Sequence, residues 1–431
     1  MATPASPQQR VNAAIERLAH RIENHFPPSL RGPRKIGREA EFPMVLPDGR
    51  AGQTARLWEP LLAEGGGKIT YDEPARRRTI VRIDLGRIGY EVETGRATAE
   101  IVFPPAADLH ELEALSGPAV AGLSRLAASC GMRALGYGIQ PRTRGTPSLM
   151  TPKRRYAQLY RAIGRPWLHF TTTASDQVQI DIARGELVDA INVMNLVSGP
   201  IIALTAHSSV YAGRVGRFVS GREGLLGGLG EHRHGMTPRR FRSVEDYVAF
   251  ICSERCYSLR DGDRFVAFRK PFTAYLAEHG SNLEMFLWHE HYTWNSARPR
   301  VKNATIEIRP ACQQPPDEPL AAAALSLALV EAMPNVMTYV QDCVGSDPWP
   351  AMAGYRREVV RHGLRAPEPA PGFLAGIVDL CEEGLRRRGR AEERFLLPIR
   401  LRLENRLLPA DRTAAVFRKS GIAGLVGALA V

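Results

Sequence analysis

Three short stretches of the chain place polar side chains two residues apart, with apolar or small residues between or beside them. They are Glu39-Ala40-Glu41, Gln177-Val178-Gln179 and Glu307-Ile308-Arg309. On a β-strand, residues i and i+2 point to the same face of the sheet, so each stretch presents its polar pair on one side and buries the other. Carboxylate oxygens suit Mg²⁺, and a guanidinium suits phosphate. The three stretches together predict one metal–nucleotide surface on a sheet.

Two more acidic residues, Glu93 and Glu100, lie in strand-like segments joined by a short turn that contains Gly95. With Glu39, Glu41 and Glu307 they make a set of carboxylates that would repel one another strongly if they faced one cleft. Two or three divalent cations would stabilise such a set. The plainer alternative is that Glu39 and Glu41 form a solvated strand face and that the 307–309 stretch forms a cross-strand ion pair.

The elements that would position these residues can be read from periodicity and from turn residues. Strands are expected at 35–46, 68–71, 79–85, 88–93, 98–103 (ending at Pro104-Pro105), 132–138, 167–173, 176–182 and 304–309. Helices are expected at 1–24, 57–62, 109–128, 154–164, 185–205, 244–256, 271–277, 319–337 and 373–431. Strands and helices alternate without βαβ regularity, which favours an antiparallel sheet and the α+β class.

The length of 431 residues predicts one large elaborated domain or two domains. We expect an N-terminal helical extension over 1–34 and a single catalytic domain over 35–431, with a helical C-terminal part from about residue 370. A long Gly-, Arg- and His-rich loop is expected at 211–236, and loops of this length are usually functional or mobile. Within it, Gly224–Gly230 is interpreted as a flexible loop, since the Lys-Ser/Thr of a phosphate-binding loop does not follow.

The composition is that of an ordinary globular enzyme, with 44% hydrophobic and 24% charged residues. The formal net charge of +12 favours anionic partners. It is explained by a generally Arg-rich composition, by a phosphate-rich ligand such as ATP, or by nucleic acid. The sequence has neither paired Cys/His spacing nor an aromatic RNA-binding signature, which disfavours nucleic acid. A non-catalytic protein that binds nucleotides or nucleic acid remains the alternative from another class.

The six cysteines and the N-terminus favour a cytoplasmic protein with free thiols, since no apolar signal-peptide region precedes them. No apolar run reaches the ~20 residues that span a bilayer, so no membrane partner is expected. Cys252 and Cys256 lie four residues apart, as a metal pair or, more simply, as two buried thiols. His232-Arg233-His234 and His289-Glu290-His291 each supply half of a zinc site without a third ligand at fixed spacing.

The order of several short segments resembles the glutamate–cysteine ligases of the plant and proteobacterial type, which are glutamine-synthetase-like carboxylate–amine ligases. The resemblance covers roughly residues 35 to 415. Besides the acidic segment from Tyr90 to Pro104, the matching segments are Ile36–Phe42, Gly136–Pro141, Pro152–Tyr156, Gln177–Asp181, Ser208–Arg222, Glu307–Arg309, Gly384–Gly389, Glu393–Leu396 and Leu408–Arg412. Each motif is weak by itself, and their ordered succession is what makes the resemblance specific.

The resemblance implies a curved antiparallel sheet that forms a half-open, half-barrel funnel flanked by helices. It also implies a reaction in which ATP and Mg²⁺ phosphorylate the γ-carboxylate of glutamate and the amine of cysteine attacks the acyl phosphate. The product would be γ-glutamylcysteine, which places the protein in glutathione biosynthesis. Phosphorylation is needed because a free carboxylate has no good leaving group, and it requires metals and cationic side chains around the phosphate.

Residue roles follow from the resemblance, position by position. The metal ligands would be Glu39, Glu41, Glu93, Glu100, Glu307 and Gln177. The ATP-binding residues would be Gln177, Gln179, Arg309 and Lys153, with Arg309 and Glu307 as catalytic residues. Arg222 and Arg155 would bind the acidic substrate, Arg222 through the bidentate geometry of its fork of donors. For Lys153 and Arg155, a solvated helix start is the alternative.

Two segments depart from the family pattern. Between Arg222 and Met236, Glu223 is followed by glycines and leucines and then by Glu231-His232-Arg233-His234, and Arg309 is followed by Pro310-Ala311-Cys312. Residues 288–300 are also only partly family-like. Because these segments would shape the acceptor pocket, a second hypothesis keeps the chemistry and changes the substrates. The protein would then join another amino acid, amine or peptide, as in natural-product biosynthesis or peptide tailoring.

Overall fold

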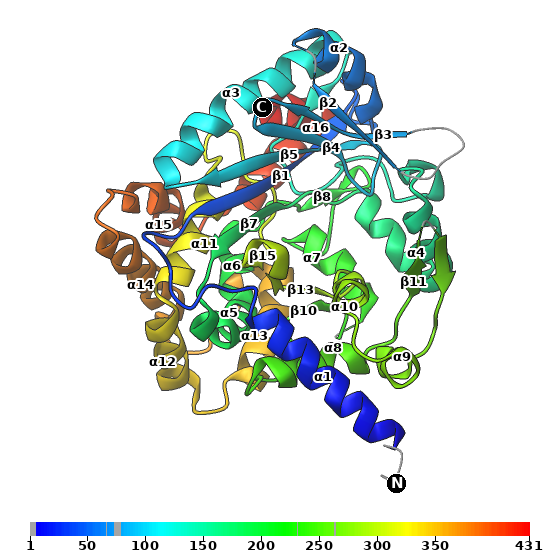
Figure 1. Cartoon of the computed structure of the whole chain (residues 1–431). Coiled ribbons are helices and arrows are strands. Elements are labelled where there is room, and N and C mark those ends of the chain that lie inside the picture. The colour runs from blue at the N-terminus through cyan, green and yellow to red at the C-terminus, as the bar shows by residue number, and fades with distance from the viewer. Residues whose placement is uncertain (1–5, 66, 73–78, 231, 263) are drawn as a thin grey trace.

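The computed structural model describes residues 6–65, 67–72, 79–230, 232–262 and 264–431. Its centre is a nine-stranded sheet in the order β14-β15-β7-β1-β5-β4-β3-β2, with β6 paired to β1 (Figure 1). The strands are β1 Ile36–Val45, β2 Lys68–Asp72, β3 Thr79–Leu85, β4 Ile88–Val92, β5 Thr98–Ala106, β6 Arg133–Ala134, β7 Asp176–Asp181, β14 Ala297–Arg300 and β15 Thr305–Ile308. Every neighbouring pair in this sheet is antiparallel, as predicted.

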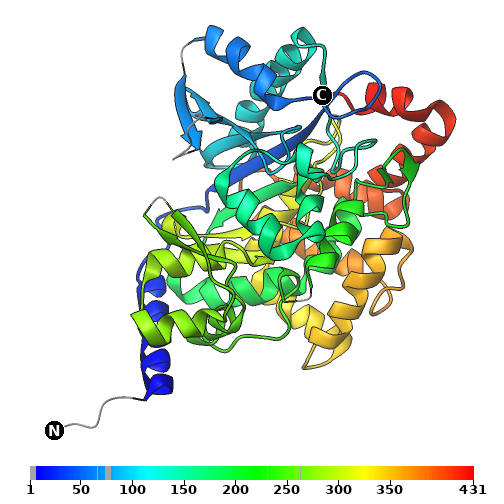
Figure 2. The same cartoon turned by 90° about the vertical axis from the view of Figure 1, so that its right-hand side faces the viewer.

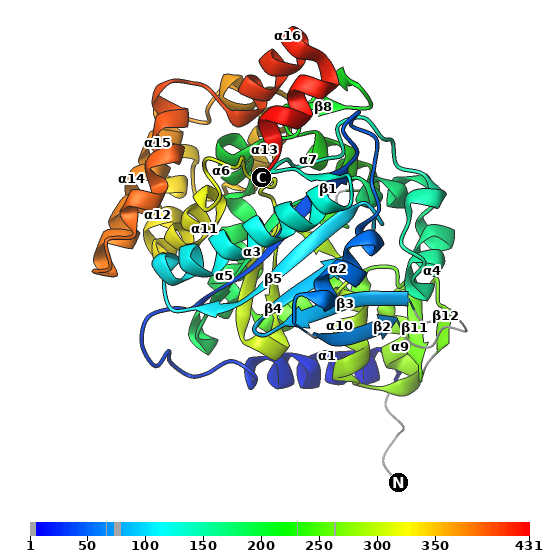
Figure 3. The ribbon, with the colours of Figure 1, turned by 90° about the horizontal axis from the view of Figure 1, so that it is seen from above.

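Helices surround the sheet on both sides. They are α1 Pro7–Glu23, α2 Trp58–Ala63, α3 Leu109–Ser129, α4 Arg154–Ile163, α5 Leu187–Leu196, α6 Ser198–Thr205, α7 Gly221–Leu226, α8 Val244–Ser253, α9 Phe272–His279, α10 Leu283–Glu290, α11 Ala321–Glu331, α12 Met333–Val344, α13 Trp349–His362, α14 Phe373–Arg387, α15 Leu397–Glu404 and α16 Pro409–Leu429. Helix α3 lies across β1 and β5 (Figure 3), while α11 packs on β7 and α5 packs on β14 and β15.

Three two-stranded pairs complete the architecture: β8 Val210–Tyr211 with β9 Arg214–Val215, β10 His234–Gly235 with β13 Trp294–Asn295, and β11 Ser258–Asp261 with β12 Arg264–Ala267. Helix α1 begins at a Ser6–Gln9 capping box and packs on α8, α9 and α10 at one end of the molecule (Figures 1 and 2). The division into 1–34 and 35–431 remains a prediction, as does the half-open funnel.

Strand β1 separates the core from the chemistry. Arg38, Ala40 and Phe42 are buried on the face that α3 covers, and Glu39 and Glu41 alternate onto the other face. The buried guanidinium of Arg38 forms a two-pronged pair with Asp176 of β7, with Nε to Oδ1 and Nη2 to Oδ2 both at 2.8 Å. Its remaining donors reach the Ser116 hydroxyl and a main-chain carbonyl oxygen. This pair cross-links the neighbouring strands β1 and β7 from the core side.

Replacing Asp176 by asparagine is expected to lower the free energy of unfolding by about 3–5 kcal/mol, because the Arg38 charge would stay buried without its counter-charge. Chemical denaturation measures the loss. Replacing Arg38 by methionine and Asp176 by leucine together should restore part of it, since the double variant removes both charges. The exposed Arg50–Asp48 pair, whose atoms lie 2.6 Å apart, is the control, and Asp48→Asn should have far less effect. If Asp176→Asn and Asp48→Asn lowered the free energy of unfolding equally, the structural role of the Arg38–Asp176 pair would be contradicted.

Two predicted strands are wrong, and one is longer than expected. Residues 167–173 lie mainly in a 3₁₀ helix, Arg165–Thr171, because Trp167 and Phe170 pack their rings against Trp294 instead of alternating across a sheet. Of residues 132–138, only β6 is strand. Strand β5 continues through Pro104-Pro105 to Ala106: β4 pairs only up to Val102, and the register with β1 shifts between Phe103 and Ala106, so neither proline has to donate to the ladder.

Three other expectations need correction. The helix predicted at 185–205 bends by 50° between α5 and α6, and the one at 319–337 bends by 85° between α11 and α12, where the new helix begins at Met333 with Pro334 in its first turn. Residues 224–230 are not a flexible loop, since α7 and a 3₁₀ turn, Gly227–Leu229, occupy most of them.

Across the described ranges, no single helix has the length and apolar composition to cross a membrane, and the two bent pairs meet that test only when joined.

Candidate active site

The strand register brings the predicted pairs together on one face of five adjacent strands. Arg298 of β14 lies opposite Glu307 of β15, which lies opposite Gln179 of β7. One step along the strands, Gln177 of β7 lies opposite Glu39 of β1, and Glu41 of β1 lies opposite Glu100 of β5. The spacing of two residues on each strand and the order of the strands therefore produce a single charged surface, as predicted.

Glu41, Glu93 and Glu100 form an acidic cluster in which one carboxylate oxygen from each residue lies within 4.8 Å of the others. Burial and the charge of Glu93 raise the pKa of Glu41 to about 7, against the opposing charge of Arg222. Burial and Glu93 also raise the pKa of Glu100 well above its usual value. Burial opposes ionisation of Glu93 too, but the hydrogen bond with Glu100 and the charge of Lys153 hold its pKa below the usual value.

The carboxylates of the acidic cluster therefore repel one another more than the neighbouring cations compensate, and a bound cation would relieve this repulsion. Hard oxygen donors this close together fit a divalent cation such as Mg²⁺. In the part of the chain that the structure describes, this is the one group of three or more His, Cys, Asp or Glu residues with such spacing. Neither predicted half of a zinc site belongs to it. His289 instead hydrogen-bonds the Ile251 carbonyl and stacks on Phe272.

Glu39 lies beside the acidic cluster and is half-buried. Its carboxylate accepts a hydrogen bond from Gln179 Nε2 at 2.8 Å. Burial and the charge of Glu307 raise its pKa to about 7, although Arg300 and Arg309 oppose this. Glu39 is thus a carboxyl group that can exchange its proton for a bound cation near neutral pH.

Glu307 is surrounded by three guanidinium groups. Its Oε2 accepts from Arg298 Nε at 2.6 Å and from Arg309 Nη1 at 2.8 Å, and Arg300 Nε lies 3.5 Å from Oε1. Burial opposes ionisation, but these three charges hold the pKa of Glu307 well below its usual range. In this structure Glu307 acts as their shared counter-ion, and its role as a metal ligand remains a prediction.

Arg309 is connected to the acidic cluster through Gln177. Arg309 Nη1 donates to Gln177 Oε1, and Gln177 Nε2 donates to Glu41 Oε1 at 2.9 Å. The other oxygen of Glu41 accepts from the Ser175 main-chain N–H at 2.7 Å. These hydrogen bonds fix the orientation of the Gln177 amide. Its oxygen faces the Arg309 guanidinium, and its nitrogen faces Glu41, a predicted metal ligand.

Most of the predicted site residues line one cavity of about 130 Å³. Glu39, Glu41, Glu93, Glu100, Arg155, Gln177, Arg222, Glu307 and Arg309 all contribute to its wall. Lys153 and Gln179 are missing from the described residues that line it. Lys153 Nζ donates to the Val92 carbonyl at 3.0 Å, and Gln179 accepts from Asn303 at 2.9 Å. Gln179 also donates to Glu39 of the cavity wall, and the contact of Lys153 and Gln179 with ATP remains a prediction.

Arg298, Arg300 and His291 also line this cavity. They lie in residues 288–300, which the sequence related to the acceptor pocket only as a segment, without naming them as substrate or nucleotide ligands. Arg298-Pro299-Arg300 shows the i, i+2 spacing of the other stretches, directly before the strand that carries Glu307, so the signal was present. Five aromatic rings from separate segments line it too, and none was named individually as a site residue; they are Tyr156, Trp167, Phe170, Tyr292 and Trp294. They form the apolar wall of the cavity.

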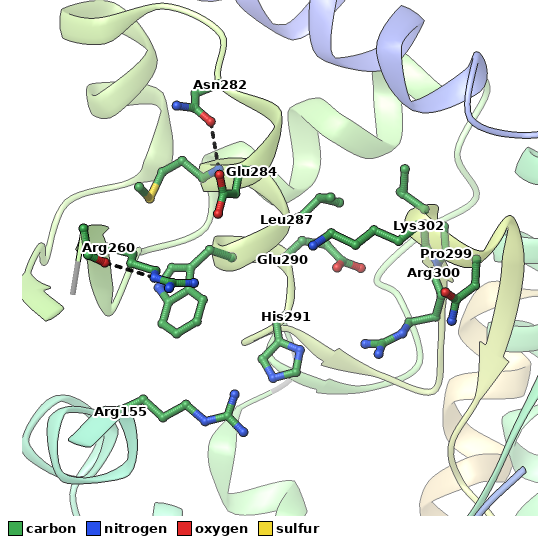
Figure 4. Close-up of a pocket in the computed structure, with 15 residues that line it drawn as sticks. Arg155, Arg260, Asn282, Glu284, Leu287, Glu290, His291, Pro299, Arg300 and Lys302 are labelled. Carbon is green, nitrogen blue, oxygen red and sulfur yellow. Dashed lines mark hydrogen bonds between the residues drawn. The ribbon is translucent and has the colours of Figure 1, made fainter. Parts of the chain in front are cut away.

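A larger cavity of about 600 Å³ adjoins the first, and Arg155, His291 and Arg300 line both. Figure 4 shows Arg155 from α4 and Arg300 from β14 directed toward His291 from opposite sides, with Lys302 reaching toward Glu290. Burial and the charges of Arg298 and Arg155 hold the pKa of His291 well below its usual value, so its ring is neutral near pH 7. The two cavities together provide a basic chamber beside an acidic cluster.

A family model described as glutamate–cysteine ligase family 2 matches residues 36–416. The chain belongs to this family. The resemblance inferred from the sequence is therefore confirmed, and the acidic cluster and its arginines are the charged centre of a glutamate–cysteine ligase family fold. No curated protein matches the sequence.

Solved structures show the same fold at low sequence identity. The crystal structure of glutamate–cysteine ligase from Francisella tularensis in complex with AMP has a TM-score of 0.55 and 12% identity, over 92% of this chain and 87% of that one. A bifunctional glutathione synthetase from Pasteurella multocida has a TM-score of 0.57 and 10% identity, over 97% of this chain. This family member spans only 53% of the Pasteurella chain. The large antiparallel sheet flanked by helices is thus confirmed as the family's fold.

The Mg²⁺ affinity of this family member is expected to fall about 10- to 100-fold from pH 8 to pH 6. A carboxyl group binds a cation in its ionised form, and Glu39 and Glu41 both have pKa values of about 7, so below pH 7 the cation must displace one or two protons. Calorimetry in buffers of different ionisation enthalpy measures both the affinity and the protons released. An Mg²⁺ affinity that does not depend on pH, with no proton released on binding, would refute the assignment of Glu39 and Glu41 as metal ligands.

Proposed function

We propose that this protein is an ATP-dependent carboxylate–amine ligase that joins the γ-carboxyl group of glutamate to the amine of cysteine through an acyl phosphate. The observation that carries the proposal is the single sheet face on which the acidic cluster, Glu39 and Arg309 meet at one cavity wall. Membership of the glutamate–cysteine ligase family supports it. An acidic cluster that needs cations, next to guanidinium groups that suit phosphate, is what phosphoryl transfer to a carboxylate requires.

The nucleotide base and ribose would occupy the larger cavity, whose volume of about 600 Å³ suits such a ligand. The phosphates would extend past Arg155 and Arg300, which line both cavities, toward Glu39. Lys302 at the rim adds a further positive charge. The complex of the Francisella ligase with AMP supports a nucleotide site within the shared fold.

Glu41, Glu93 and Glu100 would hold one Mg²⁺, while Glu39, Gln177 and Glu307 would hold a second or third ion. Bound Mg²⁺ would neutralise phosphate oxygens and orient the transferred phosphoryl group. The glutamate carboxylate attacks the γ-phosphorus and ADP leaves, which produces the acyl phosphate. The amine of the acceptor then attacks the acyl carbon, loses its proton and displaces phosphate.

Arg309 would stabilise the charge that develops on the transferred phosphoryl group. Its guanidinium is held by Glu307 and Gln177, so it needs little reorganisation when the charge forms. Arg222, on the same cavity wall, would bind the second carboxylate of the donor. Arg298 and Arg300 keep Glu307 ionised and the wall rigid.

The direct test incubates purified protein with ATP, Mg²⁺, glutamate and cysteine. Release of ADP and phosphate should depend on both amino acids, and mass spectrometry should detect γ-glutamylcysteine. Reactions without cysteine, and reactions without glutamate, are the controls. If ADP release does not exceed that of the cysteine-free control, the assignment of cysteine as acceptor fails.

The aromatic wall of the smaller cavity favours a second candidate in which the acceptor differs. Five rings with centroid separations of 4.9 to 6.1 Å face a space of about 130 Å³. Such a wall suits an amine with an apolar or planar body. The Arg222–Met236 segment, which departs from the family pattern, contributes to the adjoining wall.

A panel of amines, read by mass spectrometry, separates the two candidates. Aliphatic and aromatic amino acids, simple amines and short peptides are each supplied with ATP and glutamate. A higher kcat/KM for an apolar amine than for cysteine would support the altered acceptor. Cysteine as the best acceptor, or inertness toward every amine, would refute it.

A further inference from the structure

Arg222 uses only part of its hydrogen-bonding capacity within the protein. Its Nη1 donates to Glu223 Oε1 at 2.5 Å and to the Pro310 carbonyl at 3.3 Å, and its main-chain N–H donates to Ser208 Oγ at 3.0 Å. Its Nε is buried and has no partner among the described residues. The edge formed by Nε and Nη2 is therefore left for a ligand, and this edge binds a carboxylate with two parallel hydrogen bonds.

Glu223 is a buried carboxylate that holds this arrangement together. While Oε1 accepts from Arg222, Oε2 accepts from Arg356 Nη2 at 2.5 Å and lies 3.5 Å from His234 Nε2. Only 3% of Glu223 is exposed. Burial opposes its ionisation, but the neighbouring His234, Arg222 and Arg356 hold the pKa of Glu223 below its usual range.

Arg356 reaches Glu223 from α13, through space that a glycine leaves open. A Cβ atom at Gly235 would lie 2.8 Å from the Cζ of Arg356, and Gly235 has a φ of 91°, which L side chains rarely adopt. A larger residue at position 235 would therefore displace the Arg356 guanidinium. The contact joins residues that are 133 positions apart in the chain.

The space around Glu223 is too small for a substrate of its own. The cavity lined by Glu223, His234 and Arg222 measures about 10 Å³, which is room for no more than one water molecule. Arg222, in contrast, also lines the cavity of about 130 Å³ that holds the acidic cluster. Glu223 thus reaches the substrate only through Arg222.

We propose that Glu223, anchored by Arg356, is a positioning residue that holds Arg222 by Nη1 and turns its Nε–Nη2 edge toward the substrate carboxylate. This inference rests on the proposed function in one respect, which is that the substrate carries a carboxylate for Arg222. Glu223 belongs to the Arg222–Met236 segment, which departs from the family pattern, so the proposal gives this segment a role in binding the acidic substrate.

The sign of one kinetic change separates positioning from simple charge balance. If Glu223 only balanced charge, its removal would make the cavity more positive and would lower the KM for an acidic substrate. If it positions Arg222, its removal raises that KM in spite of the added positive charge. For Glu223→Ala we expect the KM for glutamate to rise about 10- to 100-fold, while kcat and the KM for ATP change less than about threefold.

Glu223→Gln is expected to give an intermediate KM, because the amide oxygen still accepts one hydrogen bond from Arg222. The matched control is Glu392→Gln, which alters another fully buried glutamate that is paired with an arginine, Arg388, away from both cavities. This control should leave the KM for glutamate unchanged. An unchanged or lowered KM in Glu223→Ala would overturn the proposal.

A crystal structure of Glu223→Ala supplies a readout that does not depend on turnover. The Arg222 guanidinium should leave the Pro310 carbonyl and lose its single orientation. An unmoved guanidinium would refute positioning even if KM changed. If wild-type protein turns over no carboxylate substrate, the proposed function fails, while the structure of the variant still decides whether Glu223 positions Arg222.

Discussion

Replacing Arg309 by methionine is expected to lower kcat about 10³-fold with little change in the KM for ATP. The guanidinium is held beside the acidic cluster by Glu307 and Gln177, and in the proposed reaction it acts on charge that forms only in the transition state. The fold should persist, because Glu307 keeps its pairs with Arg298 and Arg300. Steady-state kinetics with ADP release as the readout measures the change.

Two comparisons make the Arg309 experiment specific. Arg82→Met removes another sheet arginine that is paired with carboxylates, Asp84 and Glu91, outside the cavity wall, and kcat should change less than about threefold. Added guanidine should restore part of the activity of Arg309→Met if the missing group is the cation itself. A fall in kcat of less than tenfold, or an effect confined to the KM for ATP, would show that Arg309 does not act in the chemical step.

Replacing Glu100 by glutamine is expected to make the Mg²⁺-free protein more stable than wild type at pH 8, by on the order of 1 kcal/mol, and to reduce turnover about 10³-fold. The pKa of Glu100 is raised in the folded state, so the folded protein binds this proton more tightly than the unfolded chain does. The stability that Glu100 contributes to the wild type is therefore lost as the pH rises above its unfolded pKa of about 4.5. Glutamine mimics the protonated carboxyl and avoids that loss.

Saturating Mg²⁺ should reverse the order of stability. A cation that binds only the folded state stabilises wild type by about 2.7 kcal/mol at 100 times its Kd, and the variant has lost one of its ligands. Thermal unfolding at pH 5 and pH 8, with and without Mg²⁺ and without nucleotide, measures this crossing. A variant that is less stable than wild type without Mg²⁺ at pH 8, or equally stabilised by Mg²⁺, would contradict the assignment of Glu100.

The control for this experiment is Glu290→Gln. Glu290 is also buried with a raised pKa, caused first by burial, and it accepts a hydrogen bond from Tyr247 at 3.0 Å, outside the acidic cluster. Replacing Glu290 by glutamine should likewise remove the cost of ionising a buried carboxyl group at pH 8. The stabilisation by Mg²⁺ alone should remain that of wild type, which separates the loss of a buried charge from the loss of a metal ligand.

The net charge of +12 illustrates how a composition can be read in several ways. Many arginines are used in buried ion pairs within the chain: Arg38 pairs with Asp176, Arg298 with Glu307, Arg388 with Glu331 and Arg402 with Glu318. Each of these pairs sums to zero charge, so the surplus lies in groups with more arginines than carboxylates, such as Arg298, Arg300 and Arg309 around Glu307. Composition counts charges, and only the folded chain shows which of them meet solvent.

The sequence by itself determined which residues form the i, i+2 pairs, which strands carry them, and that the two side chains of a pair point to the same face of the sheet. Glu39 and Glu41 share a face because alternation along a strand is a local property, and the lack of βαβ regularity favoured antiparallel pairing. It also carried enough ordered motifs to identify the family. The errors came where long-range packing overrides local pattern, as at Trp167, and where proline signals were read without knowing which neighbours a strand would have, as at Pro104.

Only the tertiary structure decided how the charges act on one another. It placed Arg298 and Arg300 beside Glu307, brought carboxylate oxygens of Glu93 and Glu100 within 4.8 Å of each other, and joined Arg356 to Glu223 across 133 positions. A pKa depends on burial and on charges within a few ångströms, and those distances are set by contacts between distant segments. The i, i+2 pairs therefore predict a metal–nucleotide surface, while its protonation, its counter-ions and the orientation of Arg222 exist only in the folded chain.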